Sequence, residues 1–145
     1  ELLKNRGCRV DMVLGASTAN KIYAPLEGKR SVSSLTLTTD DGTAGIHGQI
    51  SESIPRLIRE FGTEVIYSCG PMGMLSAIAK IADEFNLAHQ CAVEEAMACG
   101  IGVCMTCVVP IKHEDGIKMV RTCIDGPVMD GSEIIWDRKT VLDAL

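Results

Sequence analysis

The first ninety residues contain three short apolar runs, each followed by a turn. Residues 10–14 end at Gly15-Ala16-Ser17, which predicts a strand buried on both faces. Residues 34–42 alternate β-branched and polar positions before an Asp-Gly turn, so we predict a second strand there. Residues 64–68 predict a third strand, ended by Gly70-Pro71.

Amphipathic stretches follow the second and third strands and predict helices. The first helix starts at Ser51 or Ser53, both candidate N-caps, and runs to Phe61 with Pro55 in its first turn. The second helix covers residues 72–86. Its apolar residues recur at helical spacing and predict the buried face: Met74, Ile78, Ile81 and Phe85.

This alternation of strands and helices is typical of βαβ units, so the predicted fold class is α/β with a parallel sheet. Ligands of such sheets bind beyond the carboxyl ends of the strands. Residues 15–18, 40–42 and 69–72 are therefore expected to line one binding rim. Helical periodicity disappears after residue 89, and five of the seven cysteines lie between residues 91 and 123. We predict two domains, 1–89 and a small cysteine-rich domain over 90–145.

Composition excludes several classes of partner. The net charge of −5 and the lack of a basic run argue against nucleic acid and anionic membranes. The charge-free run 96–111 is shorter than the roughly twenty residues that span a bilayer. No export signal opens the chain, and seven cysteines in such a chain favour metal or redox use in the cytoplasm. The opening ELLKNRG resembles the end of a helix closed by Gly7, which indicates a fragment that begins inside an element.

Four cysteines carry the strongest chemical signal. They follow the pattern C-x4-C-x2-C-x15-C, and the first three match the plant-type [2Fe–2S] arrangement. The expected ligands are Cys99, Cys104, Cys107 and Cys123. Zinc is the main alternative, although structural zinc sites usually combine two separate cysteine pairs. Free or disulfide-bonded thiols are a further alternative.

The residues around these cysteines suit an anionic cluster. Gly100 and Gly102 allow sharp turns that aim backbone N–H groups at sulfur. Apolar side chains are expected to exclude water: Val103, Met105 and Val108. No nearby Lys or Arg is expected to neutralise the cluster. The other three cysteines are expected to be buried and to bind no metal: Cys8, Cys69 and Cys91.

Two cysteine-containing segments carry a family resemblance. EEAMACGIGVCMTCV followed by RTCIDGPVMDGSEI resembles the C-terminal part of the electron-transfer subunit of type B dihydroorotate dehydrogenase, a ferredoxin reductase-like flavoprotein. Upstream, VDMVLGAS, TTDDGTAGIHGQISE and VIYSCGPMGML are similar to landmarks of the reductases' pyridine-nucleotide-binding domain. The resemblance covers essentially the whole chain and implies that residues 1–89 are a partial nucleotide-binding domain.

The resemblance implies an oxidoreductase subunit of pyrimidine biosynthesis. NADH would reduce FAD, and single electrons would pass through the [2Fe–2S] cluster to FMN in a catalytic partner subunit. Gly70, Pro71 and Met72 would lie beside the nicotinamide and pyrophosphate, and Asp41 and Gly42 near the adenosine. No acid–base or nucleophilic catalytic residue is expected.

Two departures from the family limit what this chain does alone. The FAD-binding barrel and the first nucleotide-domain strand with its Gly-rich turn would precede residue 1, so the chain alone is expected to be inactive and to self-associate. Ala96 stands where the family has a basic residue. Two alternatives stay open: a related NAD(P)H-dependent reductase serving ferredoxin, sulfur or hydrogenase chemistry, and a zinc-stabilised, non-catalytic binding module.

Overall fold

The computed structural model describes residues 2–137, and the chain divides into two compact units, Glu1–Gly62 and Thr63–Leu145. We call them unit 1 and unit 2 and describe each by itself. Within the described residues, no helix combines the length and apolar character needed to cross a membrane.

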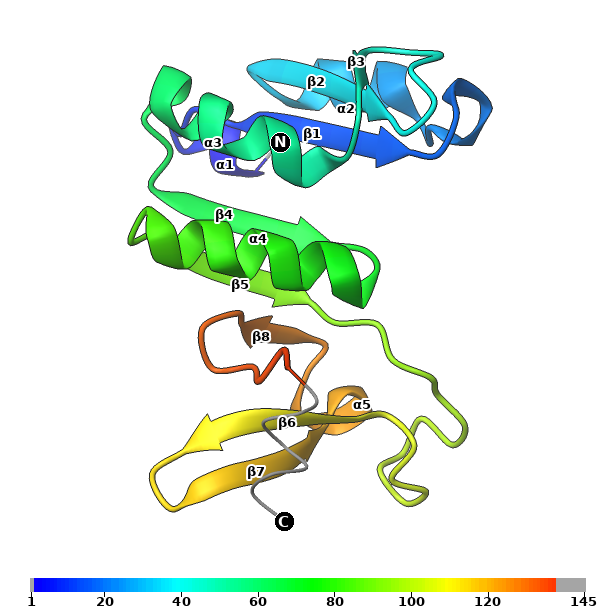
Figure 1. Ribbon diagram of the computed structural model, residues 1–145, viewed down its shortest axis with the longest axis vertical. Helices are drawn as coiled ribbons and strands as arrows, with labels where there is room; N and C mark the ends of the chain where they lie inside the picture. Colours follow the sequence, from blue (N-terminus) through cyan, green and yellow to red (C-terminus); the bar gives the residue numbers. More distant parts are fainter. Residues whose placement is uncertain (1, 138–145) are drawn as a thin grey trace. The chain divides into compact units, whose positions relative to one another are not determined.

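Unit 1 contains a parallel sheet with strand order β1-β2-β3 (Figure 1). Strands β1 and β2 pair in register from Asp11 opposite Ser34 to Ala16 opposite Thr39. The elements, in chain order, are α1 (Leu2–Asn5), β1 (Asp11–Ala16), the 3-10 helix η1 (Ala19–Lys21), α2 (Pro25–Ser31), β2 (Ser34–Thr39), β3 (Ile46–His47) and α3 (Ile50–Phe61). The parallel pairing confirms the predicted α/β class.

Two details of unit 1 differ from the sequence prediction. Strand β1 is only partly buried, because it lies at the edge of its three-stranded sheet. Helix α3 begins at Ile50, with Gln49 as its N-cap, so neither predicted serine caps it and Pro55 lies beyond the first turn. The start is set by Gly48, whose φ of +123° turns the chain out of β3.

Unit 2 combines part of a parallel sheet with an antiparallel hairpin. Strand β5 pairs in parallel with β4 and antiparallel with β8, while β6 and β7 form the hairpin. The elements are β4 (Val65–Cys69), α4 (Met72–Glu84), β5 (Ala88–Ala92), β6 (Val108–His113), β7 (Gly116–Arg121), α5 (Thr122–Asp125) and β8 (Val128–Asp130). Figure 1 shows α4 lying across β4 and β5.

One hydrophobic core connects the sheet and the hairpin of unit 2. Its buried members are Leu75, Cys91, Val93, Val109 and Ile134, and Trp136 packs against them. Helix α4 buries Leu75, Ile78, Ala79 and Ala82. Of the predicted face, Ile78 is buried and Met74 packs partly buried against the core, while Ile81 and Phe85 are half-buried.

The core also explains how the structure divides. Residues of β5 and of the cysteine-rich segment contribute to the same core, and β8 extends the sheet that β5 belongs to. The division therefore falls after Gly62, whereas the sequence predicts a domain boundary at residue 90. The division into compact units does not test where a nucleotide-binding domain ends, so the boundary at residue 90 stays a prediction.

Candidate metal centre

The four predicted ligands come from one loop and one short helix of unit 2. Cys99, Cys104 and Cys107 lie in the loop between β5 and β6, and Cys123 lies in α5. The loop runs beside α5 in Figure 1. The side chains interact in two pairs, Cys99 with Cys104 and Cys107 with Cys123. Folding thus brings the distant fourth cysteine to the loop.

Backbone N–H groups surround the sulfur of Cys99. The N–H groups of Ile101 and Cys104 donate to Cys99 Sγ, each at 3.5 Å. These bonds, with that of Cys104 foremost, lower the pKa of Cys99 to about 6. The loop can turn in this way because Gly100 and Gly102 adopt φ of +67° and +79°, which confirms the predicted turns.

The second pair joins the end of the loop to α5. The backbone and side chain of Cys123 lower the pKa of the buried Cys107 thiol. The hydrogen bond to Cys107 raises the pKa of Cys123, so within this pair Cys107 holds the thiolate more readily. The N–H of Thr122 donates to the carbonyl of Cys107 at 3.0 Å and fixes the two segments together.

The remaining thiol also has a donor. Thr106 Oγ1 donates to Cys104 Sγ at 3.1 Å. Across residues 2–137, no three His, Cys, Asp or Glu side chains form a group that could hold a metal ion as they stand. The arrangement is instead two thiol pairs with N–H and O–H donors directed at sulfur. Thiols with such donors fit an anionic iron–sulfur group.

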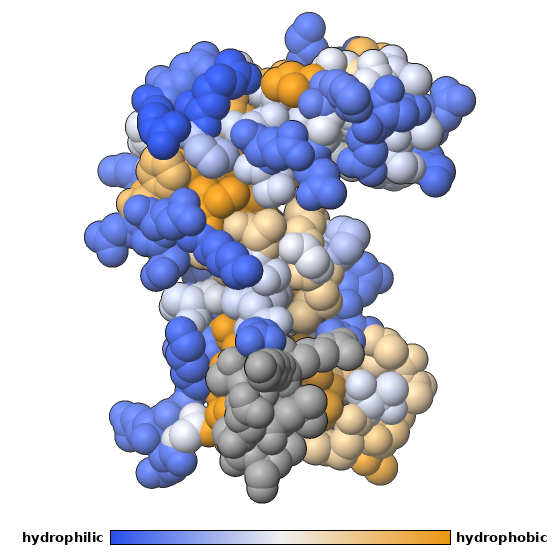
Figure 2. Space-filling view, in the orientation of Figure 1, coloured by the Kyte–Doolittle hydropathy of each residue, from blue (hydrophilic) through white to orange (hydrophobic). Residues whose placement is uncertain are grey.

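The surroundings of the loop correct two expectations. A basic residue is close: Arg121 Nη1 donates to the carbonyl of Gly102 at 2.9 Å. Val103 and Met105 do not exclude water, because 75% and 51% of their surfaces are exposed. Together with Ile101 they form an exposed apolar rim on the cysteine loop, which belongs to the hydrophobic surface of this loop in Figure 2.

The other cysteines divide between core and surface. Cys91 is fully buried in the unit 2 core, as predicted, and burial raises the pKa of its thiol. The prediction is wrong for Cys8 and Cys69, which are exposed. Cys8 follows the turn after α1, and Cys69 ends β4, where its side chain points to the face opposite α4.

The predicted nicotinamide and pyrophosphate contacts lie together in unit 2. Gly70 joins β4 to α4 with φ of +150°, and a side chain there would approach the Met74 Cε at 2.9 Å. Pro71 caps α4, and its carbonyl accepts from the N–H of Leu75. Met72 lines a cavity of about 560 Å³, bordered also by Thr106 of the cysteine loop.

The predicted adenosine contacts lie in unit 1. Asp41 Oδ1 accepts from the N–H and the hydroxyl of Thr43, and these bonds lower the pKa of Asp41. This is the geometry of a plain polar turn. Gly42 follows with φ of +72°. Asp40, rather than Asp41, lines the neighbouring cavity of about 410 Å³.

Comparison with known proteins identifies the cysteine-rich segment. Residues 94–135 match the family model of the iron–sulfur cluster binding domain of dihydroorotate dehydrogenase B. The domain includes all four predicted ligands and also Arg121.

Relatives of the whole chain agree with this assignment. The chain is 38% identical over 136 residues to the electron transfer subunit of dihydroorotate dehydrogenase B (NAD(+)) from Streptococcus mutans, covering 93% of this chain and 51% of that protein. It is 31% identical over 135 residues to the same subunit from Desulforamulus reducens, covering 93% and 52%. The chain spans about half the length of these relatives. The resemblance stated from the sequence is confirmed.

A solved structure extends the likeness to the fold. The structure of an NADH-dependent reduced ferredoxin–NADP oxidoreductase, a protein of flavin-based electron bifurcation, superposes with a TM-score of 0.74 at 28% identity. The match covers 97% of this chain and 52% of that one. The likeness therefore includes the α/β elements as well as the iron–sulfur domain.

Sequence reasoning missed Arg121 as part of the centre. It stands two positions before Cys123, so the one available signal was its closeness to the fourth ligand. That signal does not reveal a contact with Gly102, which depends on how β7 returns to the loop.

Proposed function

We propose that this chain belongs to an oxidoreductase in which electrons pass from NADH, through FAD and a [2Fe–2S] cluster, to an FMN-containing catalytic subunit of dihydroorotate dehydrogenase. The observation that carries the proposal is that four thiols interact, with two backbone N–H donors directed at Cys99, within the segment that matches the iron–sulfur domain model. The relatives are named as electron transfer subunits of that enzyme.

The proposed ligands are four cysteines that interact with one another. Cys99 hydrogen-bonds with Cys104 and Cys107 with Cys123, and all four would hold the cluster. A bound [2Fe–2S] cluster supplies one-electron chemistry at a potential set by charge, hydrogen bonds and exposure. The chain contributes the N–H groups directed at sulfur, which favour the thiolate form that iron requires.

The nucleotide contacts are the second part of the proposal. Gly70, Pro71 and Met72 would accept the nicotinamide and pyrophosphate of NADH at the end of β4, where ligands of parallel sheets bind. Asp41 and Gly42 would lie near the adenosine. FAD would be held mostly by residues outside this chain, and all seven cysteines, free of disulfides, suit a reducing compartment such as the cytoplasm.

The exposed apolar side chains of the cysteine loop are the proposed contact surface for the partner subunit. The rim of Ile101, Val103 and Met105 is apolar and lies on the cysteine loop. Electron transfer requires close approach of donor and acceptor, so the rim is the proposed contact with the FMN-containing subunit. Apolar side chains that are exposed in a free protein become favourable contacts when a partner covers them.

A ferredoxin-linked reductase is the second candidate. The observation that favours it is the likeness to the NADH-dependent reduced ferredoxin–NADP oxidoreductase. In that case the partner would be ferredoxin, and the proposed ligands would be the same four cysteines.

The test is direct transfer between the two proteins. Anaerobically purified chain is reduced with dithionite, freed of excess reductant and mixed in a stopped-flow instrument with the oxidised FMN-containing subunit or with oxidised ferredoxin. We expect rapid bleaching of FMN, slow reaction with ferredoxin, and no transfer from the Cys104→Ser variant. Faster reduction of ferredoxin than of FMN would favour the second candidate. No transfer to either acceptor would contradict the proposal.

A further inference from the structure

Arg121 binds the backbone of the cysteine loop between the two donors to Cys99. The carbonyl of Gly102 accepts from Arg121 Nη1 at 2.9 Å. The N–H groups of Ile101 and Cys104, on either side of Gly102, each donate to Cys99 Sγ at 3.5 Å. Because peptide units are planar, fixing the Gly102 carbonyl restricts how the backbone on either side of it can turn.

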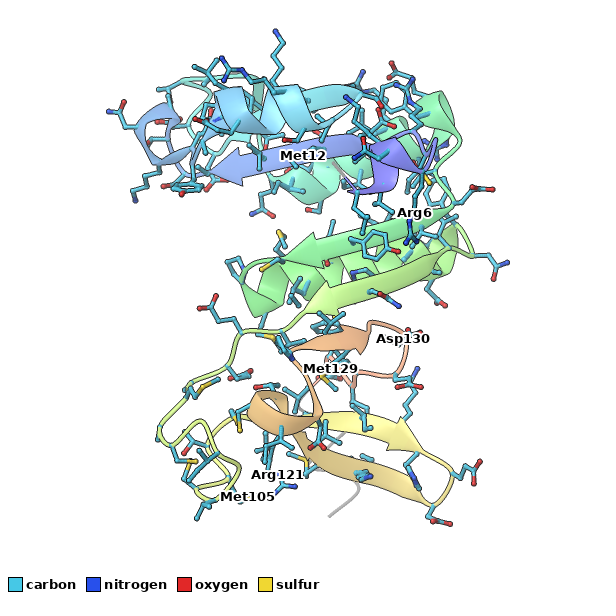
Figure 3. All side chains as sticks on the ribbon, turned by 180° about the vertical axis from the view of Figure 1, so that it is seen from behind. Arg6, Met12, Met105, Arg121, Met129 and Asp130 are labelled. Carbon is cyan, nitrogen blue, oxygen red and sulfur yellow. The ribbon has the colours of Figure 1, made fainter. Side chains whose placement is uncertain are left out.

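Contacts with Asp125 hold Arg121 in the position from which it binds the Gly102 carbonyl. The N–H of Arg121 donates to Asp125 Oδ2 at 2.8 Å, and the guanidinium Nε lies 3.9 Å from the same oxygen. The side chain of Arg121 is 37% exposed, so it is partly shielded from solvent. Figure 3 shows Arg121 beside the loop that carries Met105.

Ile124 packs against the same glycine from α5. A Cβ atom at Gly102 would overlap the Ile124 side chain. Gly102 is therefore held from two sides, by the Arg121 guanidinium at its carbonyl and by the Ile124 side chain at its Cα.

We propose that Arg121 is a positioning residue of the iron–sulfur centre: it holds the Gly102 carbonyl and so keeps the N–H groups of Ile101 and Cys104 directed at Cys99 Sγ, and it thereby raises the reduction potential of the cluster. This inference rests on the proposed function, since it requires a cluster on the four cysteines. Arg121 acts on the centre through the backbone, by its hydrogen bond to the Gly102 carbonyl.

The sign of the effect follows from electrostatics. Reduction adds one electron, and hence one negative charge, to the cluster. Donors at sulfur and a nearby positive charge stabilise the more negative form, so both raise the potential.

The test measures the reduction potential of the cluster-loaded protein by EPR-monitored redox titration. Arg121→Met removes both the positive charge and the hydrogen bond to the Gly102 carbonyl. Arg121→Lys keeps the charge but loses the planar fork. Lys118→Met is the matched control, because it removes one positive charge from the same strand, β7. Resonance Raman spectra of the Fe–S(Cys) bands report the hydrogen bonding at sulfur in the same samples.

We expect Arg121→Met to lower the equilibrium constant for one-electron reduction roughly tenfold, about 59 mV. Arg121→Lys is expected to recover part of this shift, and Lys118→Met to leave the potential and Raman bands unchanged. The inference would be overturned if the equilibrium constant for reduction of Arg121→Met stayed within twofold of that of the parent protein. It would also be overturned if the reduction potential of Lys118→Met shifted as much as that of Arg121→Met.

Cluster loss is also informative. Loss of the cluster from both Arg121 variants but not from Lys118→Met, with unchanged secondary structure by circular dichroism, supports the positioning role. Equal loss from all three variants contradicts it. A parent protein without iron and sulfide would instead refute the proposed function itself, so the two failures are distinguishable.

Discussion

Alanine at Gly102 tests the packing of the cysteine loop against α5. Gly102 has φ of +79° and its Cα faces Ile124. Gly100 has φ of +67°, and its nearest neighbour for an added Cβ is Met97 Sδ at 3.6 Å, an ordinary contact. The two glycines therefore share the backbone cost of a left-handed conformation but differ in the space available.

The expected magnitudes separate these two costs. A left-handed conformation costs an L-residue roughly 1–2 kcal/mol, which is the expected loss for Gly100→Ala. Overpacking adds roughly 1–3 kcal/mol, so Gly102→Ala should lose about 2–5 kcal/mol. Truncating Ile124 in the Gly102→Ala background should recover about 1–3 kcal/mol, because the overlap is with that side chain.

The assay is urea unfolding followed by the fluorescence of Trp136, the one tryptophan of the chain. Trp136 packs on the unit 2 core and donates to the carbonyl of Gly131, so it reports unfolding of that unit. All variants are compared in the same cluster state. Equal losses for Gly100→Ala and Gly102→Ala, or no recovery on truncating Ile124, would refute the packing argument.

Three further predictions concern unit 2 and the chain as a whole. Burial lowers the pKa of His89, so the unfolded chain binds a proton at a higher pH than the folded chain does. The free energy of unfolding should therefore fall as the pH drops below about 6.5, by up to about 1.4 kcal/mol per pH unit. In urea titrations monitored by Trp136 fluorescence, His89→Gln should flatten this slope, whereas the control His113→Gln should not. Gly131→Ala should cost about 2–3 kcal/mol in the same assay because its Cβ would overlap the His89 ring, and a loss below 0.5 kcal/mol would contradict that contact. The 145-residue chain alone should not oxidise NADH at a useful rate in a dye-reduction assay, with or without FAD, because hydride delivers two electrons and a [2Fe–2S] cluster takes one at a time; sustained FAD-independent turnover would contradict this assignment of roles.

Local patterns in the sequence predicted the element order of the α/β part. Strands β1, β2 and β4 begin and end within three residues of the predicted runs, because apolar and β-branched stretches between glycine turns usually form strands. The start of α3 could not be predicted in this way. It is set by the backbone at Gly48 and Gln49, whereas the two serines that suggested a cap lie inside the helix.

The candidate centre was predictable as far as its ligand spacing and its glycine turns. Both are local properties of residues 99–107. The pairing of Cys107 with Cys123 and the contact of Arg121 with Gly102 depend on the return of β7 to the loop, which no local pattern reports. The exposure of Val103 was missed for a related reason: hydrophobicity indicates that a residue can be buried, and not what covers it.

Iron and acid-labile sulfide, measured per chain on anaerobically purified protein, test the account's central claim most directly. We predict about two iron and two sulfide per chain, with visible absorbance that Cys123→Ser damages as severely as Cys104→Ser does. Cys91→Ser should retain the cluster, because Cys91 is buried in the core away from the two thiol pairs. Stoichiometric zinc without visible absorbance, or a cluster lost from Cys91→Ser and kept in Cys123→Ser, would contradict the account.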